Sequence, residues 1–246
     1  MGRRINNDFY DTLNEGWYTD TSHAVALLRA ENRLRVPWIK EEIGKKFQNP
    51  VSVLDIGCGA GFLTNELAKQ NHQVTGIDLS KTSLETARKY DVTKSVNYLE
   101  ASAYHLPFLN GSFDVVCAMD ILEHVENPSQ LISEASRVLK PGGLFFFHTF
   151  NRNLLSYLIV IKGVEWFVKN APKNMHVYSL FIKPKELTQI CQNSNLHIST
   201  LLGCSPKFFT LSFLRMLLTR KVQDDFTFRF SISTKTGYSG IAQKIR

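Results

Sequence analysis

The stretch VSVLDIGCGAG at residues 51–61 decides how this chain folds. Residues 51–55 form a short apolar run that predicts a buried strand, and residues 63–70 predict a helix. Between them lie Gly57, Gly59 and Gly61. Glycine allows tight turns and lets a ligand approach the backbone with no Cβ in the way. The stretch therefore predicts a ligand-binding turn at the end of a strand.

Strand-like and helix-like stretches continue to alternate as far as residue 150. The sequence predicts strands at residues 73–78, 96–100, 113–119 and 144–149, and helices at residues 80–89 and 128–139. Ser80 is the candidate N-cap of the first of these helices. Strands separated by short helices build right-handed βαβ units. We therefore expect an α/β fold with a doubly wound, mostly parallel, Rossmann-like sheet.

The 246 residues are expected to form a single domain. Its predicted parts are a helical flank at residues 1–50, a cofactor-binding core at 51–150, an apolar insertion at 151–185 and a segment that completes the sheet at 186–246. Residues 184–194 predict a further helix. The tail from Phe208 onward is rich in Phe, Thr and Ser, which favours strands.

The composition excludes several classes of protein. Hydrophobic residues make up 43% and charged residues 21%, values that exclude a disordered chain, a collagen-like fibre and a coiled coil. Four cysteines without a CxxC pair argue against a disulfide scaffold or a zinc ribbon, so we expect a reducing compartment. The net charge of +7 and the pI near 9.2 indicate either an anionic partner or a solvated basic surface.

The acidic residues beside the glycines limit the kinds of ligand that the loop can bind. The spacing is GxGxG rather than the GxGxxG of dinucleotide sites, and Asp55 precedes it. A carboxylate there would repel a pyrophosphate and suits a ligand that carries an ammonium and a sulfonium. Asp78 ends the next predicted strand, where it can accept hydrogen bonds from ribose hydroxyls. The alternative is that Asp78 only caps the helix that begins near Ser80.

Residues 51–150 resemble the class I S-adenosylmethionine-dependent methyltransferases. Besides the glycine loop, the resemblance rests on HLPF at residues 105–108, SFDVV at 112–116 and VLKPGG at 138–143. One departure is Ser102, where many relatives carry an acid that contacts the adenine. The resemblance implies S-adenosylmethionine as cofactor and a Rossmann-like fold.

More specific motifs are similar to the ubiquinone-biosynthesis O-methyltransferases. They are NRLR at residues 32–35, CAMDILEHV at 117–125, TFNR at 149–152 and the pattern from Gly163 to Leu187. This similarity runs from about residue 29 to residue 187, and the tail after Ser205 matches poorly. It implies methylation of a phenolic hydroxyl on a polyprenylated catechol or demethylubiquinol.

The family implies that Arg35, Gly57, Asp78 and Met119 contact S-adenosylmethionine, beside Asp55, Gly59 and Gly61 of the loop. An arginine could pair with the methionine carboxylate in a charge-assisted contact. The alternatives are an ion pair of Arg35 with Glu31, and simple core filling by Met119.

Catalytic and metal-binding roles are implied for Asp120, Glu123 and His124. A divalent ion such as Mg²⁺ held by two carboxylates and an imidazole could lower the pKa of the attacking oxygen. Alternatively His124 acts alone as general base, or Glu123 and His124 only cap the loop. The family usually has Glu where this chain has Asp120.

The insertion is strongly apolar, with lysines around it. Residues 153–170 read NLLSYLIVIKGVEWFVKN, which, if helical, is too short and too charged to cross a membrane and could cover the site as a lid, with Gly163 as a possible hinge. Residues 153–173 could also lie on an anionic membrane surface. No apolar signal-peptide core is present, so we expect a cytoplasmic enzyme peripheral to the inner membrane, or one on the matrix side in mitochondria.

Three other interpretations stay open. The first is a methyltransferase for another lipid or phenol, including a C-methyltransferase of the quinone pathway. The second is an RNA methyltransferase, against which the chain shows no aromatics interleaved with Arg and Lys, so we expect no nucleic acid partner. The third is a cofactor-binding, non-catalytic partner in a membrane-associated biosynthetic complex.

Overall fold

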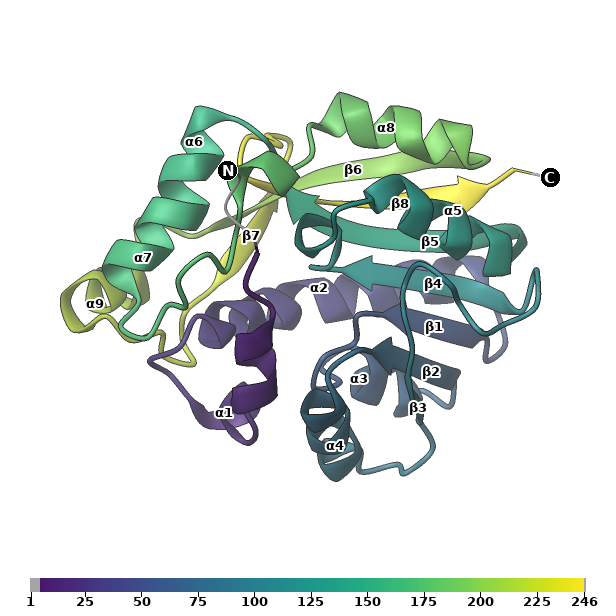
Figure 1. Ribbon diagram of the computed structural model, residues 1–246, viewed down its shortest axis with the longest axis horizontal. Helices are drawn as coiled ribbons and strands as arrows, with labels where there is room; N and C mark the ends of the chain where they lie inside the picture. The colour runs from purple at the N-terminus through teal and green to yellow at the C-terminus, as the bar shows by residue number, and fades with distance from the viewer. Residues whose placement is uncertain (1–4, 246) are drawn as a thin grey trace.

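The computed structural model describes residues 5–245, and the first four positions of the flank at 1–50 and residue 246 lie outside the described residues. One sheet runs through the described chain in the order β3-β2-β1-β4-β5-β8-β6-β7 (Figure 1). Its strands are β1 Ser52–Ile56, β2 Gln73–Asp78, β3 Asn97–Glu100, β4 Phe113–Met119, β5 Leu139–Phe150, β6 Leu196–Pro206, β7 Phe228–Ser231 and β8 Gly237–Lys244. Strands β1 to β5 pair in parallel, whereas β8, β6 and β7 add antiparallel pairs. The expected α/β sheet is confirmed.

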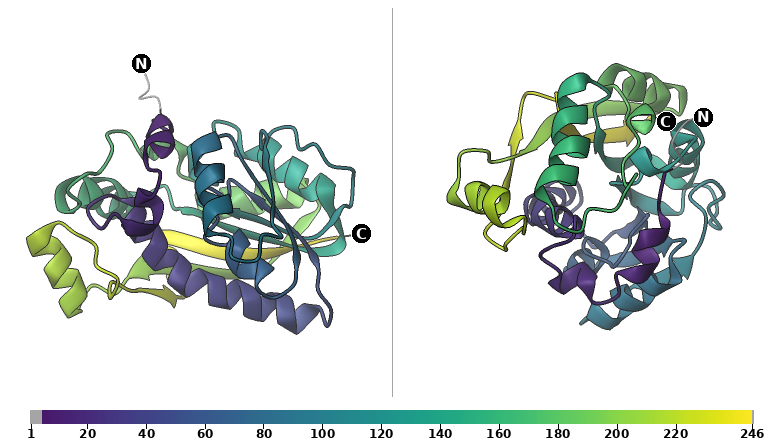
Figure 2. Two further views of the ribbon diagram at one scale, coloured as in Figure 1. Left: turned by 90° about the horizontal axis from the view of Figure 1, so that it is seen from below. Right: turned by 60° about the vertical axis from the view of Figure 1, so that its left-hand side comes forward.

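Helices cover both faces of the sheet, because successive side chains of its strands point to opposite sides. Val53 of β1 packs with α2 and α3 on one face, and its neighbour Leu54 packs with α5 and α8 on the other. These helices are α2 Val25–Lys46, α3 Thr64–Ala68, α5 Pro128–Val138 and α8 Pro184–Asn193. The long α2 runs beneath the sheet in the left view of Figure 2. The doubly wound arrangement is therefore present.

Local sequence signals explain where the helices begin. The side chain of Ser80 accepts a hydrogen bond from the amide of Ser83, so the predicted N-cap of α4 Lys81–Tyr90 is confirmed. Asn127 caps α5 in the same way, with Pro128 in the first turn. The flank is also mostly helical, with η1 Asp8–Thr12 and α1 Gly16–Thr19 before α2.

The apolar insertion forms one continuous helical column. It consists of α6 Leu154–Ser156, η3 Tyr157–Gly163 and α7 Val164–Phe167, and its middle part has π-helical hydrogen bonding. Asn153 caps its start by accepting from the amide of Ser156. The insertion is therefore helical, and its role as a lid stays a prediction. No helix within residues 5–245 is long and apolar enough to cross a membrane.

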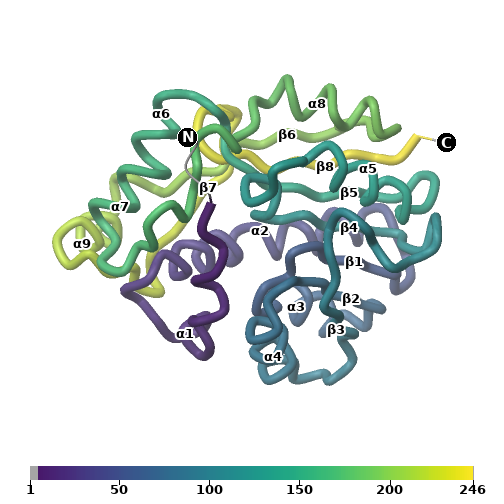
Figure 3. The backbone as a smooth tube through the Cα atoms, viewed as in Figure 1, coloured from purple at the N-terminus to yellow at the C-terminus, as the bar shows by residue number. Residues whose placement is uncertain are grey.

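The expectation of strands throughout the tail was wrong for one segment. Leu211–Thr219 forms helix α9, which Thr210 caps through the amide of Phe213. The side chains of Phe213, Met216 and Leu217, spaced three and four residues apart, pack beside Val164 and Phe167. Figure 3 shows α9 beside α7 at one end of the molecule, far from β1 to β3. This helical spacing outweighs the strand preference of the Phe and Thr residues.

Candidate active site

The glycine loop leaves the carboxyl end of β1 in a conformation that glycine favours. Gly57, Gly59 and Gly61 have φ angles of 71°, 51° and 83°. A Cβ on Gly61 would also lie 2.5 Å from the hydroxyl of Tyr98 and 3.0 Å from the Cβ of Ala87. The third glycine is therefore required both by the turn and by the close packing of the loop against its neighbours.

The carboxylate of Asp78 ties this loop to the start of α4. It accepts hydrogen bonds from the amides of Gly59 and Ser80, each at 2.9 Å. Burial raises the pKa of Asp78, and these amides oppose the rise. The N-cap of α4 is the side chain of Ser80 itself. The alternative that Asp78 only caps this helix therefore does not explain why its carboxylate also binds the glycine loop.

A cavity of about 890 Å³ opens over the loop, within the size range of small-molecule sites. It is lined by the predicted residues Asp55, Gly57, Gly59, Asp78, Met119, Asp120 and His124. Asp55 is buried there, and its pKa is raised by burial and by the charges of Asp78 and Asp120. Gly61 supports the loop from outside this lining.

The amino-terminal flank covers the cavity, which the sequence did not predict. Residues 5–8, Tyr10, Asp11 and Trp17 line it. The indole of Trp17 donates to the hydroxyl of Ser83 at 3.2 Å, and Thr82 donates to the carbonyl of Asp11 at 3.1 Å. These long-range contacts bring the flank onto α4, beside the cavity.

Arg35 lies outside this cavity and is fully buried. Its guanidinium donates two hydrogen bonds to Asp120, at 2.7 and 2.5 Å, and lies 3.5 Å from Glu31. Burial lowers the pKa of Arg35, but the charges of Asp120 and Glu31 outweigh it and raise the pKa. The contact of Arg35 with the cofactor stays a prediction, and it requires Arg35 to leave Asp120. The ion pair with Glu31 is present, but in the interior rather than on the surface.

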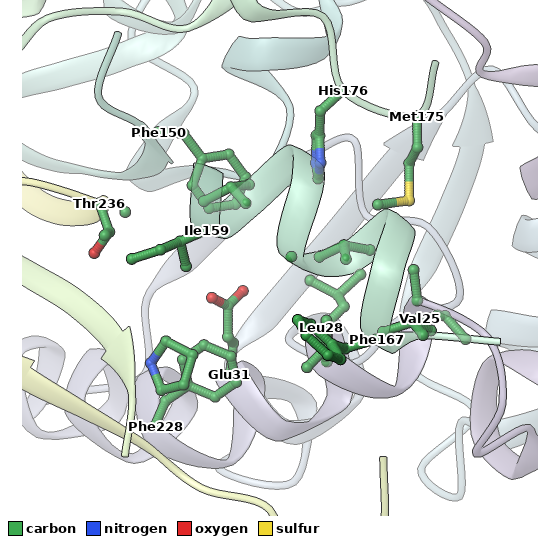
Figure 4. A pocket seen from close by; sticks show the side chains of 18 of the residues that line it. Val25, Leu28, Glu31, Phe150, Ile159, Phe167, Met175, His176, Phe228 and Thr236 are labelled. Carbon is green, nitrogen blue, oxygen red and sulfur yellow. The ribbon is translucent and has the colours of Figure 1, made fainter. Parts of the chain in front are cut away.

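A second cavity, of about 400 Å³ and mostly apolar, adjoins the first (Figure 4). Its wall comes from α2, the column of α6, η3 and α7, helix α9 and strand β7. Both cavities are lined by Tyr10, Leu28, Asp120 and His124. Asp120 has a φ of 60°, which turns the chain sharply after β4 and places it at this junction. A polar ligand on the loop and an apolar ligand in the second cavity would thus meet here.

His124 lies at the junction as a neutral imidazole. Burial lowers its pKa to about 4, against the charge of Asp120. Its Nδ1 lies 3.1 Å from Oδ1 of Asn7, a partner that sequence reasoning missed. When Nδ1–H donates to Asn7, Nε2 is available to accept a proton. An imidazole in this form can accept a proton, and the role of His124 as general base stays a prediction.

The three predicted metal ligands do not form one cluster. Among residues 5–245, side-chain ligand atoms gather within 4.8 Å of one another in two acidic and histidine groups. One consists of Glu123, His124 and His176, and the other of Glu31, Asp120 and His148. Arg35 binds both oxygens of Asp120, so this carboxylate is not free to join Glu123 and His124. Side-chain spacing alone could not reveal this arginine, and the metal site at Asp120, Glu123 and His124 stays a prediction.

Glu123 is better placed than Asp120 to bind a metal ion. It is fully buried, and neither of its oxygens has a hydrogen-bond partner within the described chain. Burial and the charge of Asp120 raise its pKa well above the usual range. His176 belongs to a motif that the sequence singled out without assigning it a role, and its ring lies 5.3 Å from that of His124. One carboxylate and two imidazoles suit a divalent metal ion.

Comparison with known proteins agrees with this geometry. The family model of the methyltransferase domain matches residues 54–147. The ubiquinone biosynthesis O-methyltransferase of Aromatoleum aromaticum is 37% identical over 199 residues, which cover 80% of this chain and 83% of that protein. The chain belongs to the ubiquinone biosynthesis O-methyltransferase family. The corresponding enzyme of Thiobacillus denitrificans is 38% identical over 79% of this chain and 83% of its own length.

Solved structures show the same fold for this family member. A putative methyltransferase from Bacillus halodurans aligns with a TM-score of 0.64 and 19% identity over 86% of this chain and 99% of its own. The magnesium protoporphyrin IX methyltransferase from Synechocystis, solved with bound SAH, aligns with a TM-score of 0.61 and 17% identity over 99% of this chain and 90% of its own. The chain is a class I, S-adenosylmethionine-dependent O-methyltransferase.

Proposed function

We propose that this enzyme methylates a phenolic hydroxyl of a polyprenylated catechol or demethylubiquinol in ubiquinone biosynthesis. The observation that carries the proposal is the junction of the two cavities at Asp120 and His124. A polar cofactor and a largely apolar phenol fit its two sides. The names of the relatives support the same substrate class.

The cofactor is held by the chain's polar groups at the ends of β1, β2 and β4. Asp78 accepts hydrogen bonds from the ribose hydroxyls, and Asp55 and the glycine loop surround the methionine part. S-adenosylmethionine supplies an electrophilic methyl group on a positively charged sulfur. Met119 and Trp17, which line the cavity, would pack against the cofactor.

His124 takes the proton from the substrate. The phenolic oxygen gives its proton to Nε2 of His124 and forms a bond to the methyl carbon while the carbon–sulfur bond breaks in line. The positive charge of the sulfonium is lost as the proton reaches the imidazole, so total charge is conserved. Burial lowers the pKa of His124 to about 4, so the ring is neutral at pH 7 but a weak base, and the charge of Asp120 opposes this effect. Asp120, held by Arg35, stabilises the imidazolium that forms.

A divalent ion is the second part of the catalytic proposal. Glu123, His124 and His176 would hold it, since Asp120 is bound by Arg35. Such an ion would lower the pKa of the phenol, and His124 would then act as its ligand rather than as the base. Methyl transfer would require the metal if His124 is its ligand, and would not require it if His124 is the base.

The long substrate tail suggests contact with a membrane. Leu154, Leu158 and Trp166 are exposed on the helical column, at 69%, 44% and 58%. Lys169 and Lys173 are exposed nearby, which suits anionic headgroups. Residues 153–173 would then rest on the cytoplasmic face of the inner membrane and admit the tail, as part of a biosynthetic complex or alone.

The test is methyl transfer from labelled S-adenosylmethionine to a prenylated catechol in anionic liposomes, with and without a chelator. We expect methylated product. Loss of product with the chelator assigns His124 to the metal, and product that survives assigns it to the base. Cofactor binding without product on any prenylated phenol would contradict the substrate class and favour another lipid or phenol.

A further inference from the structure

One carboxylic acid in the apolar cavity has no role in the reaction described so far. Glu31 lies on α2, and Figure 4 shows its carboxyl group directed into the cavity from the α2 side, with His176 across from it. The residue is 7% exposed. A polar group in such surroundings costs free energy unless it finds a partner.

The protein supplies Glu31 with only a weak partner. Within residues 5–245 no hydrogen bond reaches its carboxyl group, and the nearest cation is Arg35, whose Nη1 lies 3.5 Å away. Arg35 already donates its two terminal nitrogens to Asp120, at 2.7 and 2.5 Å. The hydrogen bonds of Arg35 therefore go to Asp120, and the carboxyl group of Glu31 is left without one.

Burial and two neighbouring charges shift the pKa of this group. Burial raises the pKa of Glu31 to about 8, with Arg35 opposing the rise and Asp120 adding to it. In either protonation state the carboxyl can accept a hydrogen bond from a ring hydroxyl, and when protonated it can also donate one to a ring oxygen.

Glu31 also lies close to the reacting end of the cavity. Its carboxyl oxygen, that of Asp120 and a ring nitrogen of His148 all lie within 4.8 Å of one another. Asp120 lines both cavities together with His124. An aromatic ring with one hydroxyl at His124 can therefore present another substituent toward Glu31.

We infer that Glu31 binds a second ring oxygen of the substrate and so selects rings that carry at least two oxygen substituents. This inference rests on the proposed function, because it assigns the orientation of the ring in that same site. The long apolar tail alone would leave the ring free to rotate. Glu31 instead determines which hydroxyl faces His124.

The test compares two substrates that share one short prenyl tail. One is a catechol with two hydroxyls, and the other is a monophenol that lacks the second. The variants are Glu31→Leu, which removes the polar group, and Glu31→Gln, which keeps a donor and an acceptor. Glu41→Leu, an exposed position further along α2, is the control.

We expect Glu31→Leu to lower kcat/KM for the catechol by roughly 10- to 100-fold and to leave the monophenol within about threefold. Glu31→Gln should keep most of the preference for the catechol. Equal losses on both substrates, with unchanged cofactor binding, would assign Glu31 to structure and overturn the inference. Unchanged discrimination in Glu31→Leu would overturn it as well.

A binding measurement separates this inference from the proposed function. Calorimetry of the two compounds on protein loaded with S-adenosylhomocysteine reports recognition without turnover. If the wild type methylates neither compound but binds the catechol more tightly only when Glu31 is present, the proposed reaction fails and the recognition role stands. Tighter binding of a protonated amine than of the catechol would show that Glu31 serves a cationic ligand rather than a ring oxygen and would overturn the inference.

Discussion

The two cavities of this enzyme are built in different ways. The cofactor cavity uses backbone amides, a glycine loop and carboxylates at the ends of neighbouring parallel strands. The apolar cavity uses side chains from segments as far apart as Leu28 and Phe228, held together by no common motif. Turn chemistry follows local sequence, whereas a wall of apolar side chains follows packing. The first cavity can be recognised in the sequence and the second cannot.

The largest effect is expected where the two cavities meet. His124→Ala removes the base or ligand at the junction and should lower kcat by roughly 10²- to 10⁴-fold. The calorimetric affinity for S-adenosylmethionine should stay within about threefold, because the loop is intact. His197→Ala, exposed on β6, is the control and should leave both values unchanged. A loss of cofactor affinity equal to the loss of rate would show that the two cavities are not separable at this residue.

The next effect belongs to the cofactor cavity. Asp78→Ala should weaken S-adenosylmethionine binding by about 100-fold, because charged hydrogen bonds contribute roughly 1.5–3 kcal/mol each. Glu100→Gln, an exposed acid at the end of the neighbouring β3, is the matched control. Calorimetric titration of both variants measures the difference. Equal affinities would remove Asp78 from the cofactor site.

The two cavities should also differ in how a glycine substitution at each changes the stability of the fold. Gly61→Ala forces a side chain into a φ of 83° against Tyr98 and should destabilise the fold by about 2 kcal/mol or more. Gly163→Ala lies in helical geometry, and its Cβ would meet only the carbonyl of Leu158, at 3.4 Å. It should stabilise by up to about 1 kcal/mol. Urea unfolding measures both. If Gly163 is also a hinge, its variant turns over more slowly despite the gain.

The smallest effect concerns the pH dependence of stability. Burial, with the charge of Arg35, lowers the pKa of His148 from 6.5 to about 3, so the folded protein keeps it neutral where the unfolded chain binds a proton. This contribution is complete above about pH 6.5 and is lost as the pH falls toward 3. As the pH falls through that range, the free energy of unfolding of His148→Asn should therefore decrease by about 1.4 kcal/mol less per pH unit than that of the wild type.

Denaturant titrations between pH 4 and pH 7 measure this slope, with His197→Asn as the exposed control. An unchanged slope in His148→Asn would mean that the folded protein binds the proton. Its Nδ1 lies 2.8 Å from the hydroxyl of Ser239 in the interior, so the neutral ring is the form the surroundings support.

By itself the sequence determined the α/β core, the glycine loop, Asp78 and the helical insertion. These depend on hydrophobic period, turn chemistry and capping, which act between residues close together in the chain. A signal for His148 was also present, as an ionisable residue in the apolar strand LFFFHT, but its partner could not be known.

Only the tertiary structure decided the composition of the active site. It joined Arg35 to Asp120 across 85 residues, grouped His176 with Glu123 and His124, turned Glu31 into the apolar cavity and folded α9 against α7. Each of these outcomes depends on contacts between distant segments, where burial and a neighbouring charge determine which pair forms. The chemistry of a polar group in an apolar interior is set by that pairing, and no local pattern contains it.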